Sequence, residues 1–186
     1  MAPDDRKRAI VEAALPLIRQ FGKDTTTKQI AEAAGIAEGT IFRVFASKQD
    51  LFEEAMAVAF DPVLFIEDLG TVDAELPLRE RLVALTTLLQ RRFVEIFALM
   101  TALAIPKPPE KHRGEATKEW RDRGYALMLA LLEPDRDRFR VPLPDVIHTL
   151  RLLTFSGSHP HITDQNLLTP DQIVDVVLYG TLTHKD

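Results

Sequence analysis

The stretch TTKQIAEAAGIAEGTIFRVF, residues 26–45, decides the fold of this 186-residue chain. Thr26 and Gln29 stand at the spacing of a capping box, in which a hydroxyl and a side-chain amide satisfy backbone amides at a helix start. Gly35 is suited to the left-handed conformation that ends a helix. Ile41 and Phe45 then recur at helical spacing. The stretch therefore predicts two short helices joined by a tight glycine turn.

Two helices this short bury too little apolar surface to stand alone, so they are expected to pack on a third. Residues 4–21 supply it, with an apolar stripe that Gly22 ends. Three helices in this order form a helix-turn-helix, whose second helix enters the major groove of DNA. We expect Phe42 and Phe45 to belong to the core of this unit.

Helical periodicity continues through the rest of the chain, so the predicted fold class is all-α with about nine helices. The predicted domains are a helix-turn-helix head over residues 1–50 and a helical body over residues 51–186. A mixed stretch at 63–76 is interpreted as a hinge, and 78–105 as one bent helix or two.

Composition narrows the class of protein. The absence of cysteine excludes disulfides and thiolate metal sites and suits the reducing cytoplasm, where we expect the chain to work. Residues 1–8 lack the apolar segment of a signal peptide, and no apolar run approaches the roughly 18 residues of a membrane span. The net charge is −5, but residues 1–52 hold 8 Lys and Arg against 7 Asp and Glu, so the acidic excess lies in the body.

No motif of an enzyme is present. The chain has no G-x-S-x-G, H-E-x-x-H, phosphate-binding loop or dinucleotide glycine pattern, so we expect neither catalysis nor a cofactor. His159 and His161 near Asp164 have a spacing that a metal can use, but the further ligands are missing, and no metal site is expected.

The N-terminal third resembles the TetR (tetracycline-repressor-like) family of bacterial transcription regulators over about residues 5–56. The residues that carry the likeness are Ala13-Ala14-Leu15 with Phe21-Gly22, Thr25-Thr26 with Ile30-Ala31 and Ala34-Gly35-Ile36, the run Gly39-Thr40-Ile41-Phe42-Arg43-Val44-Phe45, and Ser47-Lys48-Gln49-Asp50-Leu51. The chain departs from the usual pattern at four positions, where the family commonly has a capping serine, a basic or neutral residue, a tyrosine, and a histidine or tyrosine. Those positions hold Ala37, Glu38, Phe42 and Val44.

The resemblance implies a ligand-responsive regulator, most often a repressor, that binds a near-palindromic operator in double-stranded DNA as a homodimer. A DNA reader needs donors to phosphate for position and side chains at base edges for sequence. The phosphate candidates are Thr26, Lys28 and Lys48, and the base-edge candidates are Glu38, Gly39, Thr40 and Arg43. Arg43 can grip guanine with two bonds and Glu38 can accept from cytosine, although Glu38 can equally be a solvated surface charge.

Two further sets of residues follow from the same likeness. A small, largely apolar effector is expected in a body pocket lined by Phe93, Phe97, Met100, Trp120, Tyr125 and Met128, for which simple core packing is the alternative. The final two helices are expected to pair with their copies through Val146, Leu150, Leu153, Ile173, Val177 and Thr181.

A different class of function also fits the sequence. An all-helical domain for protein interaction or small-molecule binding, without sequence-specific DNA binding, would explain Glu38, Phe42 and Val44 without phosphate contacts.

Overall fold

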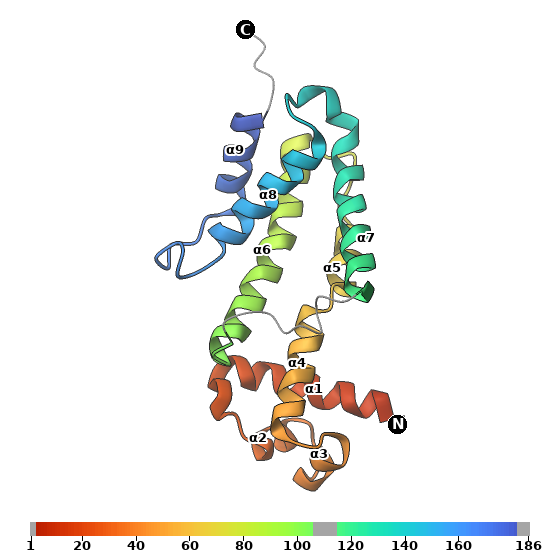
Figure 1. Ribbon diagram of the computed structural model, residues 1–186, viewed down its shortest axis with the longest axis vertical. Helices are drawn as coiled ribbons and strands as arrows, with labels where there is room; N and C mark the ends of the chain where they lie inside the picture. Colours follow the sequence, from red (N-terminus) through yellow and green to blue (C-terminus); the bar gives the residue numbers. More distant parts are fainter. Residues whose placement is uncertain (1–2, 106–114, 182–186) are drawn as a thin grey trace. The chain divides into compact units, whose positions relative to one another are not determined.

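The computed structural model describes residues 3–105 and 115–181, and within these ranges helices carry the fold (Figure 1). The helices are α1 (Pro3–Phe21), α2 (Thr27–Ala33), α3 (Glu38–Val44), α4 (Lys48–Phe60), α5 (Val63–Leu69), α6 (Leu78–Ala102), α7 (Glu115–Leu132), α8 (Leu143–Gly157) and α9 (Pro170–Thr181), with 3-10 helices η1 (Gly22–Asp24) and η3 (Glu133–Arg138). The all-α fold class and the number of α-helices are confirmed for the described residues. None of the helices in these ranges combines the length and the apolar character that a membrane span requires.

The described residues form two compact units. Unit 1 holds residues 3–61 and 95–105, and unit 2 holds residues 62–94 and 115–181. All of α4 and the end of α6 therefore pack with the helix-turn-helix, so unit 1 extends past residue 50. The functional boundary at that residue stays a prediction.

The core of unit 1 joins the first four helices. Ile18 of α1, Ile30 of α2, Ile41 of α3 and Leu51 of α4 are all fully buried in one cluster, and Leu99 from the end of α6 completes it. The short α2 and α3 owe their stability to this shared burial, because isolated helices of seven residues are unstable in water. The three-helix packing expected from the sequence is confirmed.

Gly22 connects α1 to the end of α6 within unit 1. Its φ is +57°, and a Cβ atom at this position would lie 2.3 Å from the carbonyl oxygen of Ala102. Both the backbone conformation and the close approach require glycine. The glycine that ends the first helix thus also allows the last turn of α6 to pack closely against the backbone.

The core of unit 2 is built from α5 to α9. Leu82 and Leu85 of α6, Leu132 of α7, Ile147 of α8 and Val174 of α9 are all fully buried there. Figure 1 shows α8 and α9 in blue, and these two helices pack directly on each other.

A partly buried ion pair lies at the end of α7. Arg81 donates to the carbonyl oxygen of Leu131 at 2.6 Å and also to the carboxylate of Asp135. Burial raises the pKa of Asp135, but hydrogen bonds from Arg138 and Arg81 outweigh it and hold this pKa below its ordinary value.

The structure corrects the hinge predicted at residues 63–76. Residues Val63–Leu69 form α5, and its Ile66 and Leu69 are buried in unit 2. The helix has only seven residues and no side-chain cap, so its sequence lacks a start signal of the kind that Thr26 provides for α2. Directly after α7, the charged residues Glu133–Arg138 form η3.

Candidate nucleic-acid interface

The turn between α2 and α3 has the geometry that its sequence predicts. Gly35 has φ +66°, and the amide of Ile36 donates to the carbonyl oxygen of Ala31 at 3.0 Å. These are features of a helix end closed by a left-handed glycine. The turn joins α2 to α3, and both helices are anchored in the core, through Ile30 and Ile41.

The start of α2 presents a complete capping box. The amide of Gln29 donates to the Thr26 hydroxyl at 3.2 Å, and the Thr26 amide donates to the Gln29 side-chain oxygen at 2.8 Å. Thr26 and Lys28 are both exposed at this helix start. Thr26 is therefore confirmed as a cap, and its place at a positive helix end is compatible with a nearby phosphate.

Ala37 begins α3 without a side-chain cap. Its backbone is extended, and α3 starts at the next residue with no side chain bonded to its first amides. Replacing Ala37 with serine is expected to stabilise the protein by roughly 0.5–2 kcal/mol, because a hydroxyl would satisfy one of those amides. Thermal melts of Ala37→Ser and of an Ala37→Val control measure the gain. An unchanged melting temperature for the serine variant would contradict this assignment of the cap.

Most of α3 faces solvent. Ile41 is fully buried and Phe45, directly after the helix, is 4% exposed, whereas Glu38, Gly39 and Arg43 are exposed. Thr40 is half-buried at the edge of this face. Three of the four predicted base-edge positions therefore lie on an open helix surface, and the fourth borders it.

Phe42 is not a core residue. Its side chain is 52% exposed, so the prediction that placed it beside Phe45 in the core is wrong. The helix turns about 100° per residue, and once Ile41 is buried the next side chain points outward. Phe42 thus adds an apolar surface to the exposed side of α3, next to Arg43.

Gly39 has no structural reason to be glycine. A Cβ atom added there meets nothing within 4 Å, and its φ lies in the ordinary range. Glycine in the first turn of a helix costs stability relative to alanine. The open backbone is therefore available for close approach by another molecule.

A hydrogen bond that the sequence did not indicate joins the starts of α2 and α3. The Thr27 hydroxyl donates to a carboxylate oxygen of Glu38 at 2.6 Å. The two residues are eleven positions apart in the sequence, and no local sequence pattern predicts their contact. The bond fixes the Glu38 side chain at the exposed start of α3 and leaves its second oxygen available as an acceptor.

Lys48 lies at the first position of α4, directly after the Ser47 cap, whose hydroxyl accepts from the Asp50 amide at 3.1 Å. Its ammonium donates to the carbonyl oxygen of Lys23 at 2.7 Å and lies 5.1 Å from the centre of the Phe52 ring. Two of its three N–H donors remain available for an anion.

The predicted effector residues divide between the two units. Phe93, Tyr125 and Met128 contribute to the core of unit 2, whereas Phe97 and Met100 lie in the part of α6 that belongs to unit 1. The side chain of Trp120 lies outside the described residues. One pocket in unit 2, of about 230 Å³, lies along α5 and α7 and is lined by Val63, Ile66, Glu67, Gly70, Arg123 and Leu127, a set that includes none of the predicted side chains.

The side chains predicted to pair two copies pack inside the chain. Leu153 is half-buried against the core of unit 2, and the other five are buried. Four of these five belong to that core, and Thr181 is the last residue of α9. The exposed apolar side chains of the same helices are Leu152 and Phe155 on α8 and Val176 and Tyr179 on α9, with exposed fractions of 53%, 42%, 58% and 76%. Side chains available to a partner on these helices are thus the neighbours of the predicted ones.

Comparisons with known proteins agree with this geometry. Residues 10–55 match the sequence model of the family described as "Bacterial regulatory proteins, tetR family". The chain is 45% identical over 51 residues to YhgD, an uncharacterized HTH-type transcriptional regulator of Bacillus subtilis. This match covers 27% of the chain and 27% of YhgD, so the likeness to this relative spans about a quarter of its length.

Two solved structures from Streptomyces coelicolor share the fold over nearly the whole chain. A TetR-family transcriptional regulator superimposes with a TM-score of 0.65 at 19% identity, over 95% of this chain and 79% of the other. The TetR transcriptional regulator SCO0520 superimposes with a TM-score of 0.58 at 22% identity, over 96% and 99% of the two chains. At these identities the comparison shows a common fold.

Proposed function

We propose that this chain, whose residues 10–55 match the model of the TetR family of bacterial regulatory proteins, is a DNA-binding transcriptional regulator that acts in the cytoplasm as a homodimeric repressor. The observation that carries the proposal is the exposed side of α3, where Glu38, Gly39 and Arg43 lie on a helix anchored by Ile41. A helix held from one side, with polar groups on the other, is the shape that a major groove admits.

Each exposed group has a role in this proposal. Arg43 binds guanine through two hydrogen bonds, Thr40 offers its hydroxyl or methyl group at the edge, and Glu38 accepts from cytosine. Gly39 allows the backbone to approach the groove wall. Thr26, Lys28 and Lys48 hold the flanking phosphates.

The dimer in this proposal forms through α8 and α9. Leu152, Phe155, Val176 and Tyr179 place four large apolar side chains on two helices that pack on each other. Gly180 on α9 is also exposed, with nothing within 4 Å of an added Cβ atom. Apolar patches gathered on adjacent elements mark contact surfaces more often than scattered single residues do. The two copies of α3 would then bind half-sites about one helical turn, roughly 34–36 Å, apart.

The effector in this proposal is a small, largely apolar molecule bound by the body. Phe93, Tyr125 and Met128 supply apolar and aromatic surface in unit 2. An effector that prefers the conformation with wrongly spaced heads would weaken operator binding, typically by 1–3 kcal/mol of coupling.

A gel shift against the DNA upstream of the chain's own gene tests the proposal. The measurement is repeated at two salt concentrations, because a protein that contacts phosphates loses affinity steeply as salt rises. Specific, salt-dependent retention is expected. Equal retention of scrambled DNA would favour the other class of function, a protein-interaction domain, for which the exposed ring of Phe42 is the supporting observation.

Gly39→Ala separates a structural role from a binding role. The substitution is expected to stabilise the protein by up to about 1 kcal/mol, because alanine is the better helix former and the added methyl meets open space. Operator binding is expected to weaken, because the methyl group lies between backbone and groove wall. Thermal melts and gel shifts on the same preparation measure both effects. Unchanged DNA affinity would remove Gly39 from the interface.

Phe42 is expected to read a thymine methyl group. Its exposed ring has no hydroxyl for a phosphate, and apolar contact with the thymine methyl is its remaining base-specific interaction. Replacing single operator thymines with uracil removes one methyl group, worth about 0.8 kcal/mol when fully buried. At the contacted position, uracil should weaken the binding free energy of the wild-type protein by about this amount. The same replacement should leave the DNA affinity of Phe42→Ala unchanged. If the wild-type protein tolerates uracil at every position, this contact is absent.

A further inference from the structure

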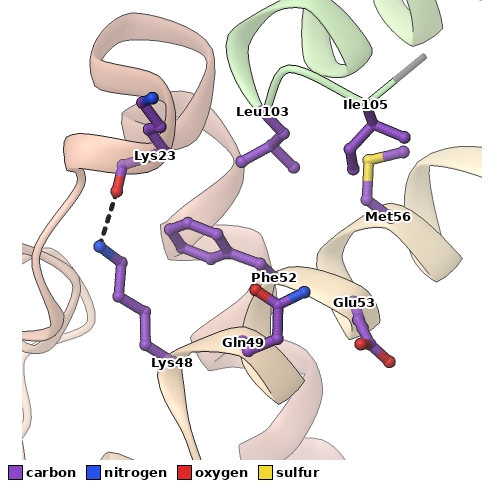
Figure 2. Close-up of a pocket in the computed structure, with 8 residues that line it drawn as sticks. All are labelled: Lys23, Lys48, Gln49, Phe52, Glu53, Met56, Leu103 and Ile105. Atoms are coloured by element: carbon purple, nitrogen blue, oxygen red, sulfur yellow. Dashed lines mark hydrogen bonds between the residues drawn. The ribbon is translucent and has the colours of Figure 1, made fainter.

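Unit 1 contains a pocket beside the candidate DNA-binding surface. It has a volume of about 390 Å³, within the range of small-molecule sites, and lies between η1, the first half of α4 and the end of α6 (Figure 2). Its lining residues are Lys23, Lys48, Gln49, Phe52, Glu53, Met56, Leu103 and Ile105. None of the predicted effector residues is among the residues that line this pocket.

The two ends of this pocket differ chemically. Phe52 and Met56 are buried at its floor, and Leu103 and Ile105 add half-buried aliphatic groups. Figure 2 shows the Lys48 ammonium at the opposite end, directed to the Lys23 carbonyl oxygen and beside the Phe52 ring. An aliphatic surface that ends at an ammonium is complementary to a molecule with an apolar chain and one anionic end.

We propose that this pocket binds an amphipathic anion, an aliphatic chain that ends in a single carboxylate. The chain lies on Phe52, Met56 and Leu103, and the carboxylate accepts hydrogen bonds from the donors of Lys48 that the Lys23 carbonyl leaves available. The buried apolar floor of Phe52 and Met56 disfavours a ligand with a second carboxylate, because that charge would be desolvated there without a partner.

The consequence for DNA rests on the proposed function. Lys48 is the proposed phosphate anchor at the start of α4, and its ammonium also borders the pocket. A bound carboxylate and a DNA phosphate therefore compete for the same cation. Because coupling between two ligands is reciprocal, operator DNA must weaken binding of the anion by the same factor.

Methionine methyl NMR locates the ligand. The chain has four methionines, of which Met56 lines the pocket and Met128 lies in the core of unit 2. With methyl-13C methionine in the full chain, decanoate is expected to shift the Met56 signal in a saturable titration and to leave Met128 in place. A shift of Met128 without Met56 would place the probe in unit 2 and overturn the proposal.

Matched probes and variants test the chemistry of the pocket. Decanol and the dicarboxylate sebacate are expected to bind at least roughly ten-fold more weakly than decanoate, and Lys48→Gln should reduce decanoate affinity about as much. Arg19→Gln removes the same charge from an exposed residue of α1 outside the pocket lining and should change affinity by less than about two-fold. Leu103→Trp fills the pocket from a half-buried position and should abolish the Met56 shift. Equal binding of decanol, or wild-type affinity in Lys48→Gln, would refute the proposal.

A final measurement separates this inference from the proposed function. Saturating decanoate is expected to weaken operator binding of the wild-type protein at least several-fold, and an unchanged DNA affinity would refute the competition at Lys48. If the protein binds no DNA at all, the proposed function fails, but the Met56 titration still decides whether the pocket holds the anion.

Discussion

Replacing Leu152 with glutamate is expected to convert the proposed homodimer into monomers and to weaken operator binding by at least about 100-fold. Leu152 on α8 is 53% exposed, so the chain itself loses little packing. Two facing glutamates in an apolar contact would be desolvated without partners. A monomer binds one half-site and loses the gain of linked binding, which commonly amounts to 10²–10⁴. Sedimentation velocity and gel shifts measure the two effects.

Leu64→Glu is the matched control for this experiment. Leu64 is an exposed leucine of α5, 74% exposed, on a helix that does not belong to the proposed contact. This variant should remain dimeric and keep its DNA affinity. If Leu152→Glu also remains a dimer with a wild-type melting temperature, the contact between copies lies elsewhere than on α8.

The helix-turn-helix was readable from the sequence because its signals are local. The capping box of Thr26 and Gln29 joins residues three apart, the left-handed turn depends on Gly35 alone, and both are present in the structure. Which side of α3 faces solvent was harder to predict from the sequence, because the apolar pattern of a seven-residue helix spans too few turns to define which side is buried. Burial of Ile41 settles which side this is and turns Phe42 to solvent.

The side chains predicted to face a second copy pack within the chain, and the sequence could not indicate this for a different reason. Periodicity identifies apolar positions on a helix, but it does not say whether the chain or a second copy covers them. On α8, Leu150 is fully buried and Leu152 is exposed, although both are leucines in one apolar segment. The hydrogen bond between Thr27 and Glu38 could not be predicted from the sequence either, because it depends on how the starts of α2 and α3 meet in space.

Replacing Arg43 with alanine is expected to remove the largest single contribution to base recognition. Arg43 is exposed in the last turn of α3. A bidentate contact to guanine discriminates by roughly 1–3 kcal/mol, so two copies in a dimer should lose about 2–6 kcal/mol on the operator. Binding to unrelated DNA should weaken much less, because it depends on charge alone. Gel shifts with operator and scrambled DNA measure the difference.

Arg136→Ala distinguishes base reading from the loss of a charge. Arg136 is an exposed arginine of η3 in unit 2, so its replacement changes the net charge equally without altering α3. If specific binding falls equally in both variants, the effect is general electrostatics and Arg43 reads no base. If it falls only in Arg43→Ala, substituting each operator guanine in turn should identify the contacted base pair, because the variant will no longer distinguish it. That position then fixes the register of α3 in the groove, from which contacts of Gly39 and Phe42 with neighbouring bases can be assigned.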